Sequence, residues 1–185
     1  MRVAATRVVT PQYRPIDTAR DMPGLFAAFL DLPHPVLLDS PPSGNTPARY
    51  SYLAADPFLV VRSKGRRVWT DERGELSAVE GSPFDVLRDL LGRYKTAPVS
   101  GLPPFQGGAI GYLAYELAHH LESLPGTAVD GLDLPEINLA FYDWVVARDE
   151  TPARHGLSPR ASPTAVRPGP DIAWTGSKSA CTVLS

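Results

Sequence analysis

The sequence predicts an α+β fold, in which antiparallel strands form one or more sheets and a few helices pack against them. Short strand-like runs follow one another between residues 50 and 79, and turn sequences separate them. Two segments, residues 22–30 and 83–91, have apolar side chains at the spacing of an α-helix. Because helices interrupt the hairpins and do not alternate with single strands, a doubly wound parallel sheet is not expected.

The first helix is expected over residues 22–30, with Asp21 as its N-cap. A short buried strand follows over residues 35–39. The next part of the chain has four runs that are typical of antiparallel strands and are joined by turn sequences: residues 50–55, 58–63, 66–70 and 75–79.

A second helix begins at Pro83, because proline is favoured at the first helical position and Ser82 can act as the N-cap. Its inward stripe consists of Phe84, Leu87, Leu90 and Leu91. After the proline- and glycine-rich segment 98–105 we expect four further segments: a strand over residues 106–111, a helix over 112–122, a loop over 123–135 and a long strand over 137–149.

The composition changes near residue 150. Residues 1–150 contain 14 basic and 19 acidic residues, all six Phe and all seven Tyr, whereas residues 151–185 contain four basic residues and one acid. Of those last 35 residues, 17 are Pro, Gly, Ser or Thr, and no helical or strand period is visible. Such a segment buries too little apolar surface to offset its backbone entropy. We therefore expect one domain over residues 1–150 and a disordered tail over residues 151–185.

The composition also limits the classes of function. A chain of 185 residues with a net charge of −2 has no overall attraction for nucleic acid or for an anionic membrane. No apolar run approaches the roughly 20 residues of a membrane-spanning helix, and the first ten residues lack the apolar core of a secretory signal. Cys181 alone cannot form an internal disulfide or a cysteine zinc site. These properties predict a cytoplasmic protein that binds neither nucleic acid, membrane nor metal.

Three clusters do not complete a functional motif. The run Gly107-Gly-Ala-Ile-Gly-Tyr112 has neither the dinucleotide nor the phosphate-loop spacing, so close backbone packing is the better interpretation. Glu116 and His120 have the spacing of a helical ligand pair but lack a third ligand, which favours a solvated helix face. Lys64 to Arg67 is interpreted as a solvated turn rather than a nucleic-acid surface. The sequence also has no pattern of a catalytic nucleophile or of paired catalytic carboxylates.

A different pattern is typical of ligand binding. Asp39 and Ser40 end a buried strand, and after a loop the chain returns with Pro47-Ala-Arg-Tyr50. A carboxylate, a hydroxyl, an arginine and aromatic rings together suit a zwitterionic amino acid with an apolar side chain. From these residues alone an alternative stays open, in which the segment is simply a strand, a loop and a strand, and Arg49 pairs with a local acid.

Three segments, taken together and in order, carry a family resemblance. They are Pro35-Val-Leu-Leu-Asp-Ser40 with Arg49-Tyr-Ser-Tyr-Leu-Ala-Ala-Asp-Pro57, then Pro103-Pro-Phe-Gln-Gly-Gly-Ala-Ile-Gly-Tyr-Leu-Ala-Tyr-Glu116, and finally Leu134-Pro-Glu-Ile-Asn-Leu-Ala-Phe-Tyr-Asp-Trp-Val-Val-Ala147. Together they resemble the N-terminal region of component I of aminodeoxychorismate synthase and of anthranilate synthase, two chorismate-utilising enzymes. The resemblance implies the α+β fold of that N-terminal domain.

Two features favour the aminodeoxychorismate branch. Anthranilate synthases typically have glutamate where this chain has Asp39, and the run Phe141-Tyr-Asp-Trp144 is similar to aminodeoxychorismate synthases. Glu116 departs from the aspartate that is more frequent in the family, and we expect its carboxylate to serve helix or interface structure. The resemblance therefore favours aminodeoxychorismate synthase component I, with anthranilate synthase component I as the alternative.

The resemblance implies a reaction that this chain does not perform alone. The complete enzyme aminates chorismate to 4-amino-4-deoxychorismate, a precursor of p-aminobenzoate and folate, with ammonia from a glutamine amidotransferase partner. Chorismate and Mg²⁺ bind to a C-terminal catalytic domain that is absent from this sequence. The resemblance therefore implies no catalytic residue, metal ligand or cofactor within this chain.

What the resemblance assigns to this chain is one side of a tryptophan pocket. The matching residues are Ser40, Pro47, Ala48, Arg49 and Tyr50. A second class of function stays open beside it, a stand-alone module that binds tryptophan or a similar amino acid.

The boundary near residue 150 suggests that residues 151–185 are an out-of-frame translation. Residues 154–163 can be encoded so that a frame shifted by two bases reads Ala-Arg-Leu-Ile-Ser-Thr-Gly-Leu-Pro, which resembles the family sequence after the Tyr-Asp-Trp strand. This hypothesis predicts rapid amide exchange throughout the tail.

Overall fold

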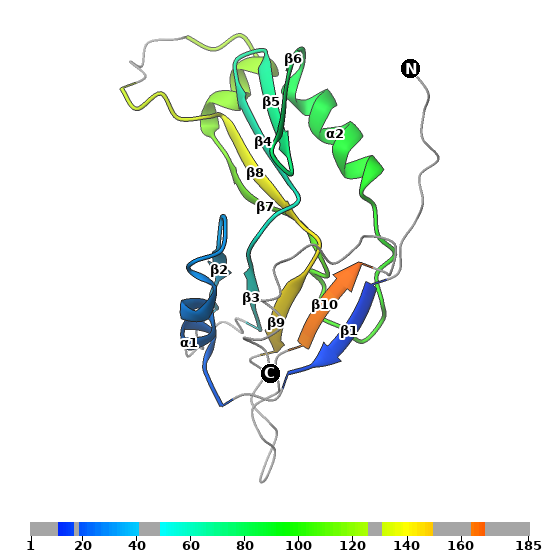
Figure 1. The fold of residues 1–185 in the computed structure, drawn as a ribbon. Helices are drawn as coiled ribbons and strands as arrows, with labels where there is room; N and C mark the ends of the chain where they lie inside the picture. Colours follow the sequence, from blue (N-terminus) through cyan, green and yellow to red (C-terminus); the bar gives the residue numbers. More distant parts are fainter. Residues whose placement is uncertain (1–10, 17–18, 41–48, 126–130, 150–163, 169–185) are drawn as a thin grey trace. The chain divides into compact units, whose positions relative to one another are not determined.

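The computed structural model describes residues 11–16, 19–40, 49–125, 131–149 and 164–168. The chain divides into two compact units, each of which has its own sheet (Figure 1). Among the described residues, the first unit contains those of Phe58–Lys95 and Ala109–Phe141, and the second contains those of Val8–Pro57, Thr96–Gly108 and Tyr142–Ser185. The domain expected over residues 1–150 thus includes parts of both units.

The first unit has a five-stranded sheet with the strand order β6-β5-β4-β8-β7. Antiparallel hairpins join β4 to β5 and β5 to β6, and β8 pairs antiparallel with the other side of β4. Its elements are β4 (Leu59–Lys64), β5 (Arg67–Glu72), β6 (Glu75–Glu80), α2 (Pro83–Arg93), β7 (Gly108–Leu113), the 3-10 helix η2 (Tyr115–His120) and β8 (Ile137–Tyr142).

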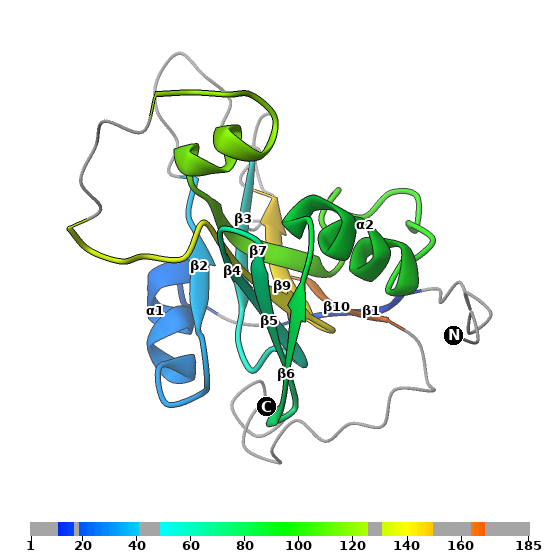
Figure 2. The ribbon, with the colours of Figure 1, turned by 90° about the horizontal axis from the view of Figure 1, so that it is seen from above.

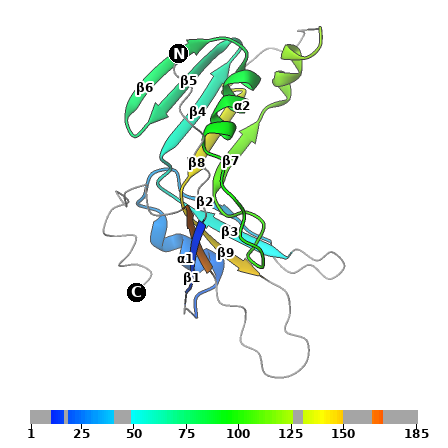
Figure 3. The ribbon, with the colours of Figure 1, turned by 90° about the vertical axis from the view of Figure 1, so that its right-hand side faces the viewer.

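Helix α2 covers one face of this sheet (Figure 3). Alternate residues of the strands point to that face, as the period of two along a strand requires. The buried cluster they form with α2 and η2 consists of Leu59, Val61, Val68, Leu90, Leu117, Ile137 and Phe141. Burial of these apolar side chains is the main force that holds the unit together.

The second unit has a five-stranded antiparallel sheet with the strand order β1-β10-β9-β3-β2. Helix α1 lies beside β2 (Figure 2). The elements are β1 (Pro11–Pro15), α1 (Met22–Phe26), the 3-10 helix η1 (Ala27–Phe29), β2 (Val36–Leu38), β3 (Tyr50–Ala54), β9 (Val145–Asp149) and β10 (Thr164–Pro168).

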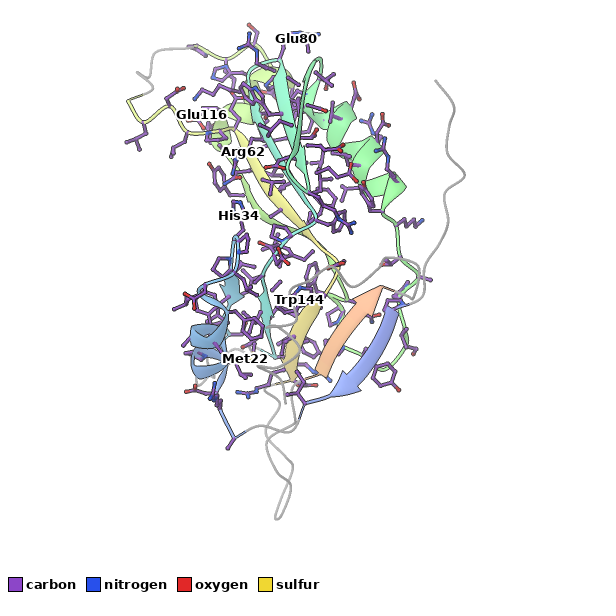
Figure 4. All side chains as sticks on the ribbon, in the orientation of Figure 1. Met22, His34, Arg62, Glu80, Glu116 and Trp144 are labelled. Atoms are coloured by element: carbon purple, nitrogen blue, oxygen red, sulfur yellow. The ribbon has the colours of Figure 1, made fainter. Side chains whose placement is uncertain are left out.

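The core of the second unit lies between α1 and the sheet. Asp21 caps α1 as the sequence predicts, because its Oδ1 accepts a hydrogen bond from Gly24 N at 2.8 Å. Trp144, labelled with Met22 in Figure 4, packs against Phe29 with 5.4 Å between ring centres. The buried residues of this core are Ile16, Met22, Leu25, Phe29, Leu53, Ala55 and Val146.

The structure confirms the expected fold class of antiparallel sheets with a few helices, but two expected elements differ. Instead of one helix over residues 112–122, β7 continues to Leu113 and a 3-10 helix follows. The backbone at Gly111 runs so close to β8 that an added Cβ would lie 2.0 Å from Asn138 O. The long strand expected over residues 137–149 is divided, and its halves, β8 and β9, join different sheets.

Strand β10 lies within the segment where the sequence predicts a disordered tail. It pairs antiparallel with β9 on one side and with β1 on the other (Figure 1). Because both neighbours offer backbone hydrogen-bonding groups, a short segment without a clear strand pattern can be held there. The rest of residues 151–185 lies outside the described residues, so its disorder stays a prediction.

Candidate functional site

The chain that follows β2 is fixed to β3 through Ser51. Ser51 is fully buried, and its Oγ donates a hydrogen bond to Asp39 Oδ1 at 3.1 Å and accepts one from Ser40 N at 3.0 Å. Strands β2 and β3 pair antiparallel just before this point. A buried hydroxyl therefore positions the two polar residues that the sequence places at the end of a strand.

Arg49, just before β3, forms a bidentate ion pair with Asp149 at the end of β9. Its Nε and Nη2 donate hydrogen bonds to the carboxylate at 2.9 to 3.2 Å, and its guanidinium carbon lies 4.8 Å from the centre of the Tyr50 ring. The hydrogen bond to Asp149 raises the pKa of the Arg49 guanidinium, which therefore stays charged. Arg49 thus pairs with an acid 100 residues away in the sequence, and not with the local acid of the alternative that the sequence left open.

Three aromatic rings form a row in the same unit. The ring centres of Tyr50 and Tyr52 lie 6.2 Å apart, and Phe105 meets Tyr52 edge to face at 5.6 Å. Burial raises the pKa of the Tyr52 hydroxyl. Phe105 is positioned by its neighbour Gln106, whose side chain bonds to the backbone N and O of Val99 at 2.8 and 2.9 Å. This row offers a partly buried apolar surface to an aromatic group.

The predicted site residues divide between the two faces of the second sheet. Ser51 belongs to the face covered by α1, since Leu53, two residues on, packs in the core with the α1 residues. The rings of Tyr50 and Tyr52 belong to the opposite face. Ser40 is therefore bonded to the α1 side of β3, whereas Tyr50 lies on the other side. Pro47 and Ala48 lie outside the described residues.

The sequence reasoning missed a buried arginine in this region. Arg148 in β9 is 5% exposed and lies directly opposite Ser51 in the pairing of β3 with β9. Its Nη2 donates a hydrogen bond to Arg20 O at 2.5 Å. The available signal was the period of two, because Arg148 follows Val146 by two residues and so shares its buried face.

The other clusters of the sequence have structural contacts in the first unit. His120 Nε2 lies 3.1 Å from Glu136 Oε2, whereas Glu116, its partner in the sequence pattern, is exposed. Lys64 Nζ donates to Leu134 O at 2.8 Å, and Arg67 pairs with Glu80 at 3.1 Å. Over the described residues, no group of three or more His, Cys, Asp or Glu side chains could hold a metal ion. In the same part of the chain, no helix is long and apolar enough to span a membrane.

Comparison with known proteins finds no matching family model but several similar proteins. The chain is 38% identical over 126 residues to anthranilate synthase component 1 of Acetivibrio thermocellus, covering 68% of this chain and 26% of that protein. It is 30% identical over 134 residues to aminodeoxychorismate synthase component 1 of Escherichia coli K12, covering 72% of this chain and 29% of that protein. The chain thus spans roughly a quarter of the length of these relatives.

One solved structure supports the fold independently. Anthranilate synthase component I from Streptococcus pneumoniae TIGR4 superimposes with a TM-score of 0.51 at 19% sequence identity, covering 98% of this chain and 35% of that one. At this identity the likeness concerns the fold, and it confirms the architecture that the sequence resemblance implied.

Proposed function

Because this chain is similar to component I of two chorismate-utilising synthases, we propose that it corresponds to the N-terminal part of such a component I, in the anthranilate branch. The observation that carries the proposal is the 38% identity over 126 residues to the Acetivibrio thermocellus protein. A complete component I of this branch converts chorismate to anthranilate with ammonia from a glutamine amidotransferase subunit. In this proposal the chain contributes structure and regulation, and the chemistry belongs to the rest of the enzyme.

The described residues of this chain do not provide a ligand set that fits the Mg²⁺ ion that the family uses. A divalent ion of this kind needs several oxygen ligands in one place. The described residues bring no such group of acidic side chains together, and Asp39 and Asp149 are already engaged with Ser51 and Arg49. No step of the reaction is therefore assigned to a metal held by this chain.

Aminodeoxychorismate synthase component I is a second candidate, which Asp39 favours. The resemblance places glutamate at this position in anthranilate synthases. The Asp39 carboxylate is 3.1 Å from the buried Ser51 hydroxyl, whose backbone is fixed by pairing with β9. A glutamate side chain is one methylene longer. It would have to adopt a bent conformation or displace the Ser51 hydroxyl. The aspartate therefore suits the local geometry of this chain.

We also propose that the region around Ser40 and Tyr50 forms one side of an amino-acid pocket, as the resemblance to the tryptophan pocket implies. The partly buried rings of Tyr50, Tyr52 and Phe105 supply its apolar surface, whereas the Asp39 carboxylate is bonded to Ser51 on the other face of the sheet. Arg49 stays in the proposal as a residue that orders the start of β3, because its guanidinium is held by Asp149.

The test is reconstitution from two pieces. The chain is mixed with the part of the Acetivibrio thermocellus component 1 that this chain does not match, and anthranilate is followed by its fluorescence with chorismate, ammonia and Mg²⁺. We expect no anthranilate from the chain alone, and a higher rate of anthranilate formation from the two pieces together than from either piece alone. A parallel reaction with the corresponding Escherichia coli piece, assayed for 4-amino-4-deoxychorismate, tests the second candidate.

A matched control is the chain with Gly111→Val, which cannot keep β7 against β8 because of the close approach to Asn138 O. This variant should not raise the turnover of either the Acetivibrio thermocellus piece or the Escherichia coli piece. If the unmodified chain neither associates with a piece in gel filtration nor raises turnover, the proposal is wrong.

A further inference from the structure

Strand β6 is an open edge of the first sheet. It stands at the end of the strand order β6-β5-β4-β8-β7, so among the described residues it has a neighbouring strand on one side alone (Figure 3). Every residue of β6 is exposed, including the large apolar side chains of Leu76 and Val79. Proteins usually protect such an edge with lysine, proline, a bulge or a covering segment. The sequence of β6 contains neither lysine nor proline, and its register with β5 has no bulge.

The hydrogen-bonding pattern shows which backbone groups of β6 point away from β5. Gly81 N donates to Arg66 O at 2.8 Å, so these residues form a hydrogen-bonded pair at the end of the β5–β6 ladder. Hydrogen-bonded and non-hydrogen-bonded pairs alternate along an antiparallel ladder. In the register of β5 with β6, the non-hydrogen-bonded positions are therefore Leu76, Ala78 and Glu80. The N–H and C=O groups of these residues point to the open edge.

The outward-pointing groups select one register for a second copy of β6. Two β6 strands can pair antiparallel with Ala78 opposite Ala78 of the second copy, which places Leu76 opposite Glu80 on both sides. Each of these pairs then exchanges two hydrogen bonds, and every outward-pointing residue of both strands is used. A shift of the register would leave some of these residues facing the chain beyond the strand. The arrangement is two-fold symmetric, so it closes at a dimer.

The charges at the ends of β6 are complementary in the same register. Glu75 lies opposite Gly81 of the second copy, and Arg66 of that copy is bonded to Gly81 through the backbone. Since glycine has no side chain, the exposed side chains of Glu75 and Arg66 take neighbouring positions. Glu80 is already paired with Arg67 of its own chain at 3.1 Å. Directly opposite positions thus carry no like charges, which would destabilise the pairing.

The face of β6 that points away from α2 adds apolar surface to this edge. Val79 is opposite Val68, which belongs to the buried cluster beneath α2, so Leu76 and Ala78 point to the other face. Trp69 is directly opposite Ala78 and is 37% exposed, whereas Leu76 is 77% exposed. Pairing of two copies would align Trp69 and Ala78 in one row across β5 and β6 of both copies. Contacts along such a row stabilise a sheet, because apolar side chains leave water.

We propose that β6 is a self-association edge, through which two copies of this chain join their first sheets into one continuous sheet. The occupant of the edge is a second copy, because the register that uses every outward-pointing backbone group also brings Glu75 beside Arg66. The proposed function does not involve this edge, so the inference is independent of the synthase assignment.

The experiment is sedimentation velocity on the full chain over a series of protein concentrations. The chain has a mass of 20.0 kDa, so we expect a reversible increase with concentration toward twice that mass. Because a two-fold pairing uses both copies of the edge, no species larger than a dimer should form.

Two lysine substitutions at adjacent positions test the register. Ala78→Lys brings two like charges opposite each other at the two-fold axis and should weaken dimerisation by about tenfold or more. Ser77→Lys is the matched control, because its side chain is also exposed but points to the other face and lies opposite Val79 of the second copy. It should change the dimer dissociation constant by less than about twofold. Urea unfolding of both variants checks that the fold is kept.

Charge reversal tests the contact between Glu75 and Arg66. Glu75→Arg or Arg66→Glu alone should weaken dimerisation by roughly fivefold, since an attraction becomes a repulsion at both ends of the pair. The double variant should dimerise like the unmodified chain. Glu75 and Gly81 of one strand are about 20 Å apart, at about 3.3 Å for each residue. Restoration therefore requires a contact between two copies.

Three results would overturn the proposal. One is a chain that stays monomeric up to about 1 mM. The second is a dimer that Ala78→Lys and Ser77→Lys weaken equally, or growth beyond a dimer, because either would place the contact on another surface. The third is a double variant that dimerises no better than the single variants. None of these results bears on the reconstitution test of the synthase assignment.

Discussion

Arg49 and Asp149 are 100 residues apart in the sequence and join the start of β3 to the end of β9 through a bidentate ion pair. Their side chains are 58% and 27% exposed, so water and salt screen the attraction. We predict that Arg49→Met lowers the urea midpoint slightly at low salt, and that the difference shrinks in about 1 M NaCl. Asp149→Asn should behave in the same way.

Equilibrium urea unfolding of the three proteins at both salt concentrations measures this effect. A difference for Arg49→Met that is unchanged by salt, with none for Asp149→Asn, would mean that Arg49 acts by packing on the Tyr50 ring.

Tyr142 provides a pH-dependent prediction. Its hydroxyl donates a hydrogen bond to His34 O at 2.7 Å, and burial raises the pKa of this phenol from 10.0 to about 12. The native state therefore holds the proton more tightly than the unfolded state does. The stability linked to Tyr142 is complete below pH 10 and decreases as the pH rises through about 12. Absorbance of phenolate during a pH titration should include a late step from Tyr142, which ionises near pH 12.

Substitution separates this contribution from general alkaline unfolding. Tyr142→Phe should cost about 1 kcal/mol at neutral pH, because His34 O loses its donor, and it should remove the late step from the titration. The matched control is Tyr115→Phe, since Tyr115 is 85% exposed. If the two substitutions changed the stability and the titration equally, the late ionisation would not belong to Tyr142.

Local patterns predicted most of the fold, and the exceptions have physical causes. The alternation of apolar residues predicts β4 and β5, and capping by Asp21 predicts the start of α1. The division of residues 137–149 into β8 and β9 was not predictable, because apolar residues occur in both halves and the sequence does not state which sheet each half joins. Strand β10 depends on its two neighbours rather than on its own pattern.

The candidate site was predictable only in part for a similar reason. The sequence places Asp39 and Ser40 at a strand end, where the structure has them. Which acid pairs with Arg49, and which buried residue lies opposite Ser51, both depend on the register of β3 with β9. That register joins segments about 100 residues apart, and no local pattern specifies it.

Two glycines form a matched pair for a test of backbone packing. An added Cβ at Gly111 would lie 2.0 Å from Asn138 O, whereas at Gly92, inside α2, it would meet nothing within 4 Å. We predict that Gly111→Ala destabilises the protein by about 3 kcal/mol, because two backbones must move apart. Gly92→Ala should stabilise it by roughly 0.5–1 kcal/mol, since alanine favours the helix.

Thermal or urea unfolding of both glycine variants gives the comparison. If Gly111→Ala were as stable as the unmodified chain, β7 would not lie as close to β8 as the structure places it.

Glu136 connects three elements of the first unit. Its carboxylate lies 3.1 Å from His120 Nε2 on η2, with both side chains about 85% buried. Its backbone N donates to Ser63 O at the end of β4, and its backbone O accepts from Ala114 N after β7, both at 2.7 Å. Loss of the side chain would leave the largely buried His120 side chain without this partner and would loosen η2.

We therefore predict that Glu136→Ala costs about 2 kcal/mol and that Glu136→Gln, which keeps an acceptor oxygen but no charge, costs about half as much. The control is Glu116→Ala on the same 3-10 helix, where the exposed side chain should change stability by less than about 0.5 kcal/mol. Urea unfolding at neutral pH, with Trp69 as a fluorescent probe in the first unit, measures all three. Equal costs for Glu136→Ala and Glu116→Ala would show that the pair with His120 does not stabilise the unit.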